Sequence, residues 1–199
     1  MTATTSTAVS AETVDERHPE TVTSATGAGD TTERVTSHPE YELQAPTSDL
    51  RIRALDPLPA PVDMLAELPL GTARGDLVTQ SRREIRDVLA GDDDRLLVIV
   101  GPCSVHDPEA ALDYAHRLAA VAKDLSEDLA IVMRVYFEKP RTTVGWKGLI
   151  NDPDLDGTHD VNRGLHLARE VLLGVLDAGV PAATEFLEPT SPQYIADAV

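Results

Sequence analysis

Apolar, strand-like runs alternate with helix-like segments along the second half of the chain, and this alternation limits the fold more than any other feature. The run Leu96–Val100 is apolar at every position, and a second strand is predicted at 130–137. Helical patterns occupy 108–125 and about 160–177, and a third strand is predicted at 180–186. This order predicts an α/β fold with a parallel sheet, in which the first strand is buried on both faces.

The predicted helices carry start and stop signals. Asp107 stands directly before Pro108, as expected for an N-cap followed by the first helical residue. An earlier helix is predicted at about 75–89, with Gly91 positioned to end it. Another helix is predicted to begin at Pro192. These signals fix the order of the elements along the chain.

The composition divides the chain into three parts. Residues 1–47 are rich in Thr, Ser, Ala and Glu and contain few large apolar residues, so we expect a disordered tail. Residues 48–94 are expected to form an arm and a helix, with an extended Pro-rich connector at 56–61. Residues 95–199 hold the strand–helix units.

The charge balance excludes several classes of function. The 199 residues carry a formal net charge of −17, which argues against binding nucleic acid or anionic membranes. The single cysteine excludes an internal disulfide framework and fits a reducing compartment. The sequence shows neither a signal peptide nor an apolar run of membrane-spanning length. We therefore expect a cytoplasmic protein.

The run Lys139–Thr143 predicts a phosphate-binding loop. Its two cations flank Pro140, and two threonine hydroxyls follow the second cation. The run follows the second predicted strand, while Gly101–Ser104 follows the first and Glu185 lies at the end of the third. Because the carboxyl ends of parallel strands meet at one edge of a sheet, we expect these segments to converge on a phosphorylated small molecule.

Three residues near these strand ends are each open to two interpretations. Cys103 is a candidate metal ligand, but a free cysteine is as often a small buried hydrophobe. His106 is a candidate ligand or base, although a role in the turn into the next helix is favoured. Arg134 lies inside an apolar strand and needs a partner, either a carboxylate or a ligand phosphate. The nearby Lys139 and Arg141 favour the phosphate.

The segments 101–104 and 133–153 resemble the class I DAHP synthases, and the resemblance extends over 48–199. These transferases, phospho-2-dehydro-3-deoxyheptonate aldolases, open the shikimate pathway of aromatic amino acid biosynthesis. The resemblance implies a (β/α)8 TIM barrel with an N-terminal extension, of which this chain would hold about three βα units. It also implies that phosphoenolpyruvate condenses with erythrose 4-phosphate and releases inorganic phosphate.

The resemblance assigns roles to individual residues. Cys103 matches a metal ligand, and Glu185 matches a carboxylate that lines the phosphoenolpyruvate site. Lys139 matches a catalytic residue that also lies near the aldehyde of the second substrate. The residues that match substrate contacts are Arg134 and Lys139 for phosphoenolpyruvate, and Pro140, Arg141 and Thr142 for erythrose 4-phosphate.

The resemblance also implies a divalent metal (Mn, Fe, Co or Zn), an aromatic amino acid effector and a homo-oligomer. The family's remaining metal ligands come from strands that follow the region matched here. A single thiolate does not hold a catalytic metal, so we expect these 199 residues alone to be inactive. The residues that match the effector site are Asp49, Glu188, Pro192 and Gln193.

Two alternatives to a DAHP synthase portion remain. The first is a non-catalytic fragment that pairs with full-length subunits through residues 48–70. The second is a related aldolase that makes a KDO-type acid from arabinose 5-phosphate. The intact run Lys139–Thr143 and its matching flanks argue against that aldolase.

Overall fold

The computed structural model describes Leu50 and residues 55–199. The predicted tail of residues 1–47 lies outside the described residues, and so does Asp49, which is predicted to belong to the effector site. Among the described residues the elements are α1 (Pro61–Glu67), α2 (Thr72–Ala90), β1 (Leu96–Val100), α3 (Pro108–Asp124), β2 (Leu129–Arg134), α4 (Val161–Asp177), β3 (Ala182–Ala183), α5 (Pro192–Ile195) and the 3-10 turn η1 (Ala196–Ala198).

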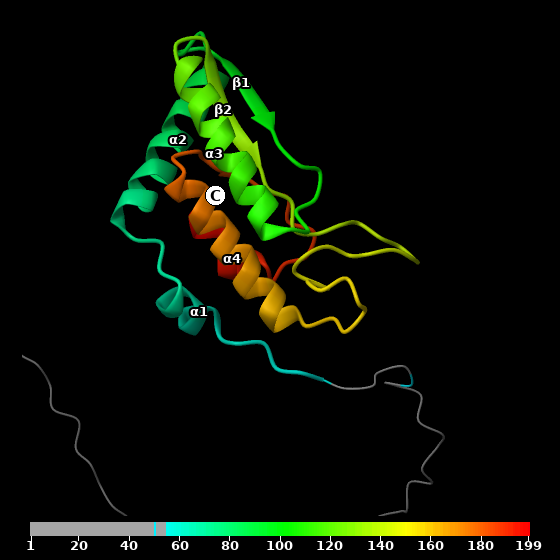
Figure 1. Ribbon diagram of the computed structural model, residues 1–199. Coiled ribbons are helices and arrows are strands. Elements are labelled where there is room, and N and C mark those ends of the chain that lie inside the picture. The colour runs from blue at the N-terminus through cyan, green and yellow to red at the C-terminus, as the bar shows by residue number, and fades with distance from the viewer. Residues whose placement is uncertain (1–49, 51–54) are drawn as a thin grey trace, which may run out of the picture. The chain divides into compact units, whose positions relative to one another are not determined.

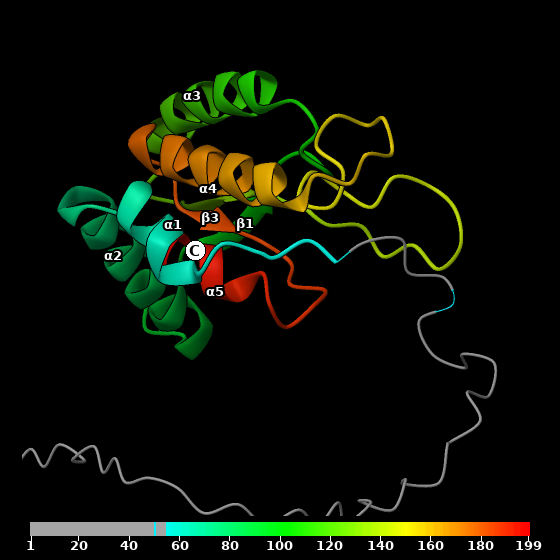
Figure 2. The ribbon, with the colours of Figure 1, turned by 90° about the horizontal axis from the view of Figure 1, so that it is seen from below.

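The three strands form one parallel sheet in the order β1-β2-β3, and α3 and α4 run side by side across it (Figures 1 and 2). In the register, Val100 lies opposite Met133, and Met133 lies opposite Ala182 on the other side. Each crossover contains a helix, the usual connection between parallel strands. The predicted α/β fold with a parallel sheet is therefore confirmed.

The predicted helix signals are also confirmed. The carboxylate of Asp107 accepts a hydrogen bond from the backbone N–H of Ala110 at 3.1 Å and so caps α3. Gly91 ends α2 with a φ of 81°, a left-handed conformation that glycine adopts without strain. The buried face predicted for α4 consists of Leu165, Ala168, Leu172 and Val175, and all four are buried.

Three details differ from the sequence predictions. Helix α1 follows the predicted Pro-rich connector and was not predicted; Pro61 supplies its first residue. Strand β3 has two residues instead of seven, because its ladder with β2 stops where β2 ends at Arg134. Burial of β1 on both faces is wrong for the described residues. Leu96 is 65% exposed and Ile99 54% exposed, because no described strand covers the outer edge of β1.

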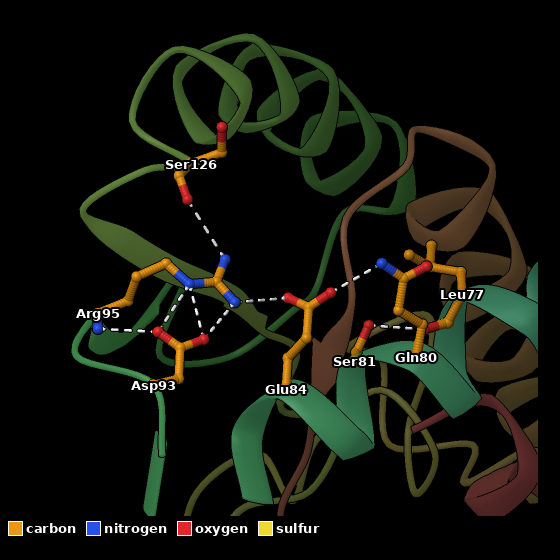
Figure 3. Close-up of polar contacts among 7 residues, drawn as sticks. All are labelled: Leu77, Gln80, Ser81, Glu84, Asp93, Arg95 and Ser126. Carbon is orange, nitrogen blue, oxygen red and sulfur yellow. Dashed lines mark hydrogen bonds and ion pairs between the residues drawn. The ribbon is translucent and has the colours of Figure 1, made fainter. Parts of the chain in front are cut away.

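A polar network joins α2 to the amino end of the sheet (Figure 3). Arg95 donates to the carboxylate of Asp93 at 2.7 Å and to that of Glu84, on α2, at 3.0 Å. Its remaining Nη donates to the carbonyl of Ser126 at 3.3 Å. All guanidinium nitrogens of Arg95 are therefore paired within the protein, which indicates a structural role.

We expect the packing of α1 against α4 to weaken at alkaline pH. A hydrogen bond from Nδ1 of His166 to the carbonyl of Asn162 raises the pKa of His166, and the carboxylate of Glu67, on α1, adds to the effect although burial opposes it. A raised folded-state pKa stabilises the fold fully below the ordinary pKa of about 6.5, and this contribution is lost as pH rises through the folded value. The stability difference between the wild type and His166→Gln, measured by urea unfolding from pH 5 to pH 9, should therefore shrink as pH rises. A constant difference would contradict this explanation.

The described helices include none with the length and apolar composition needed to cross a membrane.

Candidate functional site

The loops after β1 and β2 bring Cys103 and Lys139 into direct contact. The ammonium of Lys139 lies 2.9 Å from the Sγ of Cys103 and donates to the carbonyl oxygen of the same residue at 2.7 Å. The two residues are 36 positions apart in the sequence and meet because parallel strands end at the same edge of the sheet. The predicted convergence of these two segments is therefore confirmed.

Lys139 lowers the pKa of the Cys103 thiol, first through its hydrogen bond and then through its charge, while Arg134 and Arg141 add smaller electrostatic contributions. Substituting Lys139→Met should raise that pKa, because the thiolate loses its nearest cation. The pH dependence of iodoacetamide alkylation measures the change. Lys147→Met is the matched control, since only the backbone carbonyl of Lys147 bonds to Lys139. An equal shift in both variants would show that the contact is not responsible.

Arg134 is held by backbone carbonyls instead of a carboxylate. Its Nη2 donates to the oxygen of Gly101 at 2.7 Å and its Nε to that of Pro102 at 3.2 Å. The guanidinium also lies over the ring of Tyr136, 5.5 Å from its centroid. Within residues 55–199 no ion pair includes Arg134, so the carboxylate alternative is excluded for this part of the chain. Its positive charge remains available to an anionic ligand.

Close backbone approach positions the loops around these cations. A Cβ at Gly101 would lie 2.5 Å from the backbone oxygen of Arg134, so the first loop packs directly against β2. The backbone N–H of Lys139 donates to the carbonyl of Lys147 at 2.9 Å and closes the second loop. Between these anchors lies an exposed cationic segment with two hydroxyls: Pro140, Arg141, Thr142 and Thr143.

A buried carboxylate, not singled out as a site residue from the sequence, links the second loop to the segment after β3. Glu138 is 5% exposed and accepts a hydrogen bond from the hydroxyl of Ser191 at 3.1 Å. It also accepts a bond from the backbone N–H of Leu187 at 3.4 Å. The period-two placement of Glu138 with Arg134 and Tyr136 was the available sequence signal. Glu185 is exposed and has no hydrogen-bond partner among the described residues.

Of the residues after β3 that are predicted to form the effector site, Glu188 lines a small cavity. Glu188 and Glu138 both line a cavity of about 160 Å³. Burial alone raises the pKa of Glu188, but the backbone N–H groups of Thr190 and Ser191 donate to its carboxylate and lower that pKa overall. Pro192 begins α5, and Gln193 is exposed on its surface. The structure places these residues in one segment, at the start of α5 and directly before it.

The described residues do not provide a complete metal site. Cys103 is exposed and presents one sulfur, and residues 55–199 contain no group of three or more His, Cys, Asp or Glu side chains arranged to hold an ion. One thiolate is too few ligands for a resident divalent metal. These residues alone therefore do not fit the metal that the resemblance implies.

Comparisons of the sequence and of the structure with known proteins identify the family of this chain. The model of the DAHP synthetase I family matches residues 69–199. This chain belongs to that family. A phospho-2-dehydro-3-deoxyheptonate aldolase from Corynebacterium glutamicum is 60% identical over 158 residues, and the Phe-sensitive aldolase of Escherichia coli is 54% identical over 149 residues.

The structural comparison identifies the same family. The aldolase structure from Francisella tularensis matches with a TM-score of 0.72 and 47% identity, covering 74% of this chain and 43% of that one. The matches to the C. glutamicum and E. coli enzymes cover 79% and 75% of this chain and 43% of each relative. This DAHP synthetase family chain therefore spans about two fifths of the length of these relatives.

Proposed function

We propose that this chain is the N-terminal portion of a DAHP synthase. The enzyme would condense phosphoenolpyruvate with erythrose 4-phosphate and water and release DAHP and phosphate, the first step of the shikimate pathway. The observation that carries this proposal is the contact between Lys139 and Cys103 beside Arg134, in a chain of the matching family.

The proposed roles follow from charge and position. Arg134 and Lys139 bind phosphoenolpyruvate, and Lys139 also lies near the aldehyde of the second substrate. Arg141 and Thr142, positioned by Pro140, hold the phosphate of erythrose 4-phosphate through charge and a hydroxyl donor. Cations between two phosphorylated substrates offset the mutual repulsion of those substrates, which allows both to be held close together.

The proposal also gives roles to one carboxylate and to the thiol of Cys103. Glu185 lines the phosphoenolpyruvate site. A divalent metal would use Cys103 as one ligand together with ligands beyond the described residues, and when bound it would supply Lewis-acid chemistry. The 199 residues by themselves are proposed to be inactive, because a single thiolate does not retain the ion.

The proposed fold and regulation follow the same family assignment. The described strands are the first three of a (β/α)8 barrel, preceded by an N-terminal extension that contacts another subunit of a homo-oligomer. An aromatic amino acid effector would bind near Glu188, Pro192 and Gln193, with Asp49 from a neighbouring subunit. The sensitivity named for the E. coli relative supports an effector of this class.

A chimera tests the proposed reaction. The 158 residues of the C. glutamicum relative that align with this chain are replaced by the corresponding residues of this chain. We expect the chimera to release phosphate from phosphoenolpyruvate with erythrose 4-phosphate, and the Arg134→Met version to lose at least about 100-fold in activity, since a transition-state charge contact is removed. A folded chimera that uses arabinose 5-phosphate instead would favour the KDO-type alternative. A folded chimera with neither activity would leave the non-catalytic fragment as the better account.

A further inference from the structure

One aromatic side chain anchors the exposed loop at 140–147, which projects beyond the carboxyl ends of the strands (Figure 1). Among these residues only Trp146 is half-buried, and it packs against the hydrophobic core, whereas the others are exposed. The indole N–H of Trp146 donates to the backbone carbonyl oxygen of Asp152 at 2.6 Å. This hydrogen bond satisfies the polar end of the indole and ties the loop to the segment that follows it.

Asp152 gives this bond a fixed support. It is 6% exposed, and its carboxylate accepts hydrogen bonds from the backbone N–H of Gly157 at 3.1 and 3.3 Å. The backbone N–H of Asp152 donates to the carbonyl of Gly148 at 3.0 Å. Gly148 packs directly on the backbone of the buried Phe137. The indole of Trp146 is therefore bonded to backbone that is itself held against the segment after β2.

The side chain of Arg141 rests on the residue that precedes this anchor. A Cβ at Gly145 would lie 3.2 Å from the Nε of Arg141 and 3.4 Å from its Cδ, so the arginine lies against the Cα of Gly145. Within residues 55–199 no ion pair includes Arg141, which leaves its charge for a ligand. The position of the Arg141 guanidinium thus depends on Gly145, and the position of Gly145 depends on Trp146.

The ammonium of Lys139 is held by different contacts. It donates to the carbonyl oxygen of Cys103 at 2.7 Å and lies 2.9 Å from the Sγ of the same residue. Trp146 takes part in neither contact. Loss of the indole N–H should therefore free Arg141 to move while the ammonium of Lys139 stays beside Cys103.

We propose that Trp146 is a positioning residue that sets the distance between the charges of Arg141 and Lys139, and so selects the length of the aldose phosphate that the site accepts. This inference rests on the proposed reaction, in which Lys139 lies near the aldehyde of the second substrate and Arg141 binds its phosphate. The two ends of one sugar phosphate must reach both cations together. A fixed separation of the cations favours one chain length, whereas a loop released from its anchor accepts a longer sugar.

The chimera with the C. glutamicum relative tests the proposal with erythrose 4-phosphate and arabinose 5-phosphate, which differ by one carbon. Trp146→Phe keeps an aromatic ring and removes the N–H donor. We expect the KM for erythrose 4-phosphate to rise about tenfold, as for a weakened charge-assisted contact, with the KM for phosphoenolpyruvate nearly unchanged. The preference for erythrose 4-phosphate over arabinose 5-phosphate, expressed as the ratio of their kcat/KM values, should fall about tenfold. Val144→Ala, at an 85% exposed position in the same loop, is the control and should match the unsubstituted chimera.

Gly145→Ala displaces Arg141 by a second route, because the added Cβ meets the arginine side chain while the indole keeps its partner. It should give the same split between the two substrates, and it decides the question if Trp146→Phe does not fold. The 199-residue chain gives a readout without substrate. The backbone N–H of Lys139 donates to the carbonyl of Lys147, next to the anchor, and Trp146→Phe should speed its amide exchange about fivefold.

The outcomes separate this inference from the proposed reaction. An unsubstituted chimera that folds but releases no phosphate would overturn the proposed reaction and this inference with it. An active chimera in which Trp146→Phe and Gly145→Ala raise both KM values equally, or neither, would overturn the positioning role alone. Unchanged amide exchange at Lys139 in Trp146→Phe would also overturn it.

Discussion

The variant Asp197→Ala should lose about 3 kcal/mol of unfolding free energy, because it leaves the fully buried guanidinium of Arg169 without its counter-ion. Arg169 donates to both carboxylate oxygens of Asp197, at 2.7 and 2.9 Å. It also donates to the carbonyls of Leu68 at 2.6 Å and Tyr194 at 2.8 Å, and so joins α4 to the end of α1 and to α5. The expected loss is at the low end for a broken buried pair, since Asp197 is 37% exposed and partly screened by water.

The pair formed by Arg74 and Asp177 is a matched control for this prediction. It has the same two-pronged geometry, with contacts of 2.7 and 2.6 Å, but both side chains reach solvent. Asp177→Ala should therefore cost less than about 1 kcal/mol. Urea unfolding measures the loss of unfolding free energy in both variants, and an unchanged m-value shows that the loss is one of stability. Equal losses for the two substitutions would show that burial of Arg169 does not set the cost.

The variant Gly148→Ala should lose about 3 kcal/mol or more of unfolding free energy, because backbone strain and a steric collision combine at this position. Gly148 has a φ of 108°, and an added Cβ would lie 2.1 Å from the backbone oxygen of Phe137. The loop after β2 must move to relieve the collision. Since Lys147 anchors the backbone N–H of Lys139, the movement should also separate Lys139 from Cys103.

Gly157→Ala separates backbone strain from collision. Gly157 also has a left-handed φ, of 78°, but an added Cβ would meet nothing within 4 Å. Gly157→Ala should therefore lose only about 1–2 kcal/mol of unfolding free energy, the cost of the left-handed conformation. Urea unfolding gives both losses, and iodoacetamide alkylation reports the thiol pKa of Cys103, which should rise in Gly148→Ala alone. An equal loss of unfolding free energy in the two variants would contradict the close packing of Gly148 against the backbone of Phe137.

Local chemistry explains which parts of the fold could be predicted from the sequence. The caps at Asp107 and Gly91 depend on side-chain oxygen and on backbone freedom, which are properties of single residues. The convergence of Cys103 with Lys139 was predictable because it follows from parallel strand order alone. The resemblance carried by residues 133–153 then predicted the family that the comparisons identify.

Tertiary contacts explain what could not be predicted. The two-residue length of β3 depends on where its partner β2 ends, and the exposure of β1 depends on which neighbours are present. Arg169 sits within an otherwise apolar helix face, and only its three-way contact with α1, α5 and η1 shows why a charge is tolerated there. The roles of Glu185, Arg141 and the effector residues remain predictions that require ligand measurements.

The proposal that these 199 residues hold an incomplete active site is tested most directly by a phosphate-release assay. The 199-residue chain alone is assayed in the presence of phosphoenolpyruvate, erythrose 4-phosphate and Mn²⁺. The C. glutamicum relative and the chimera serve as positive controls. We predict that both controls release phosphate and that the chain alone releases none above the blank, because Cys103 lacks further metal ligands among the described residues. Turnover by the chain alone at a rate near that of the relative would contradict the account.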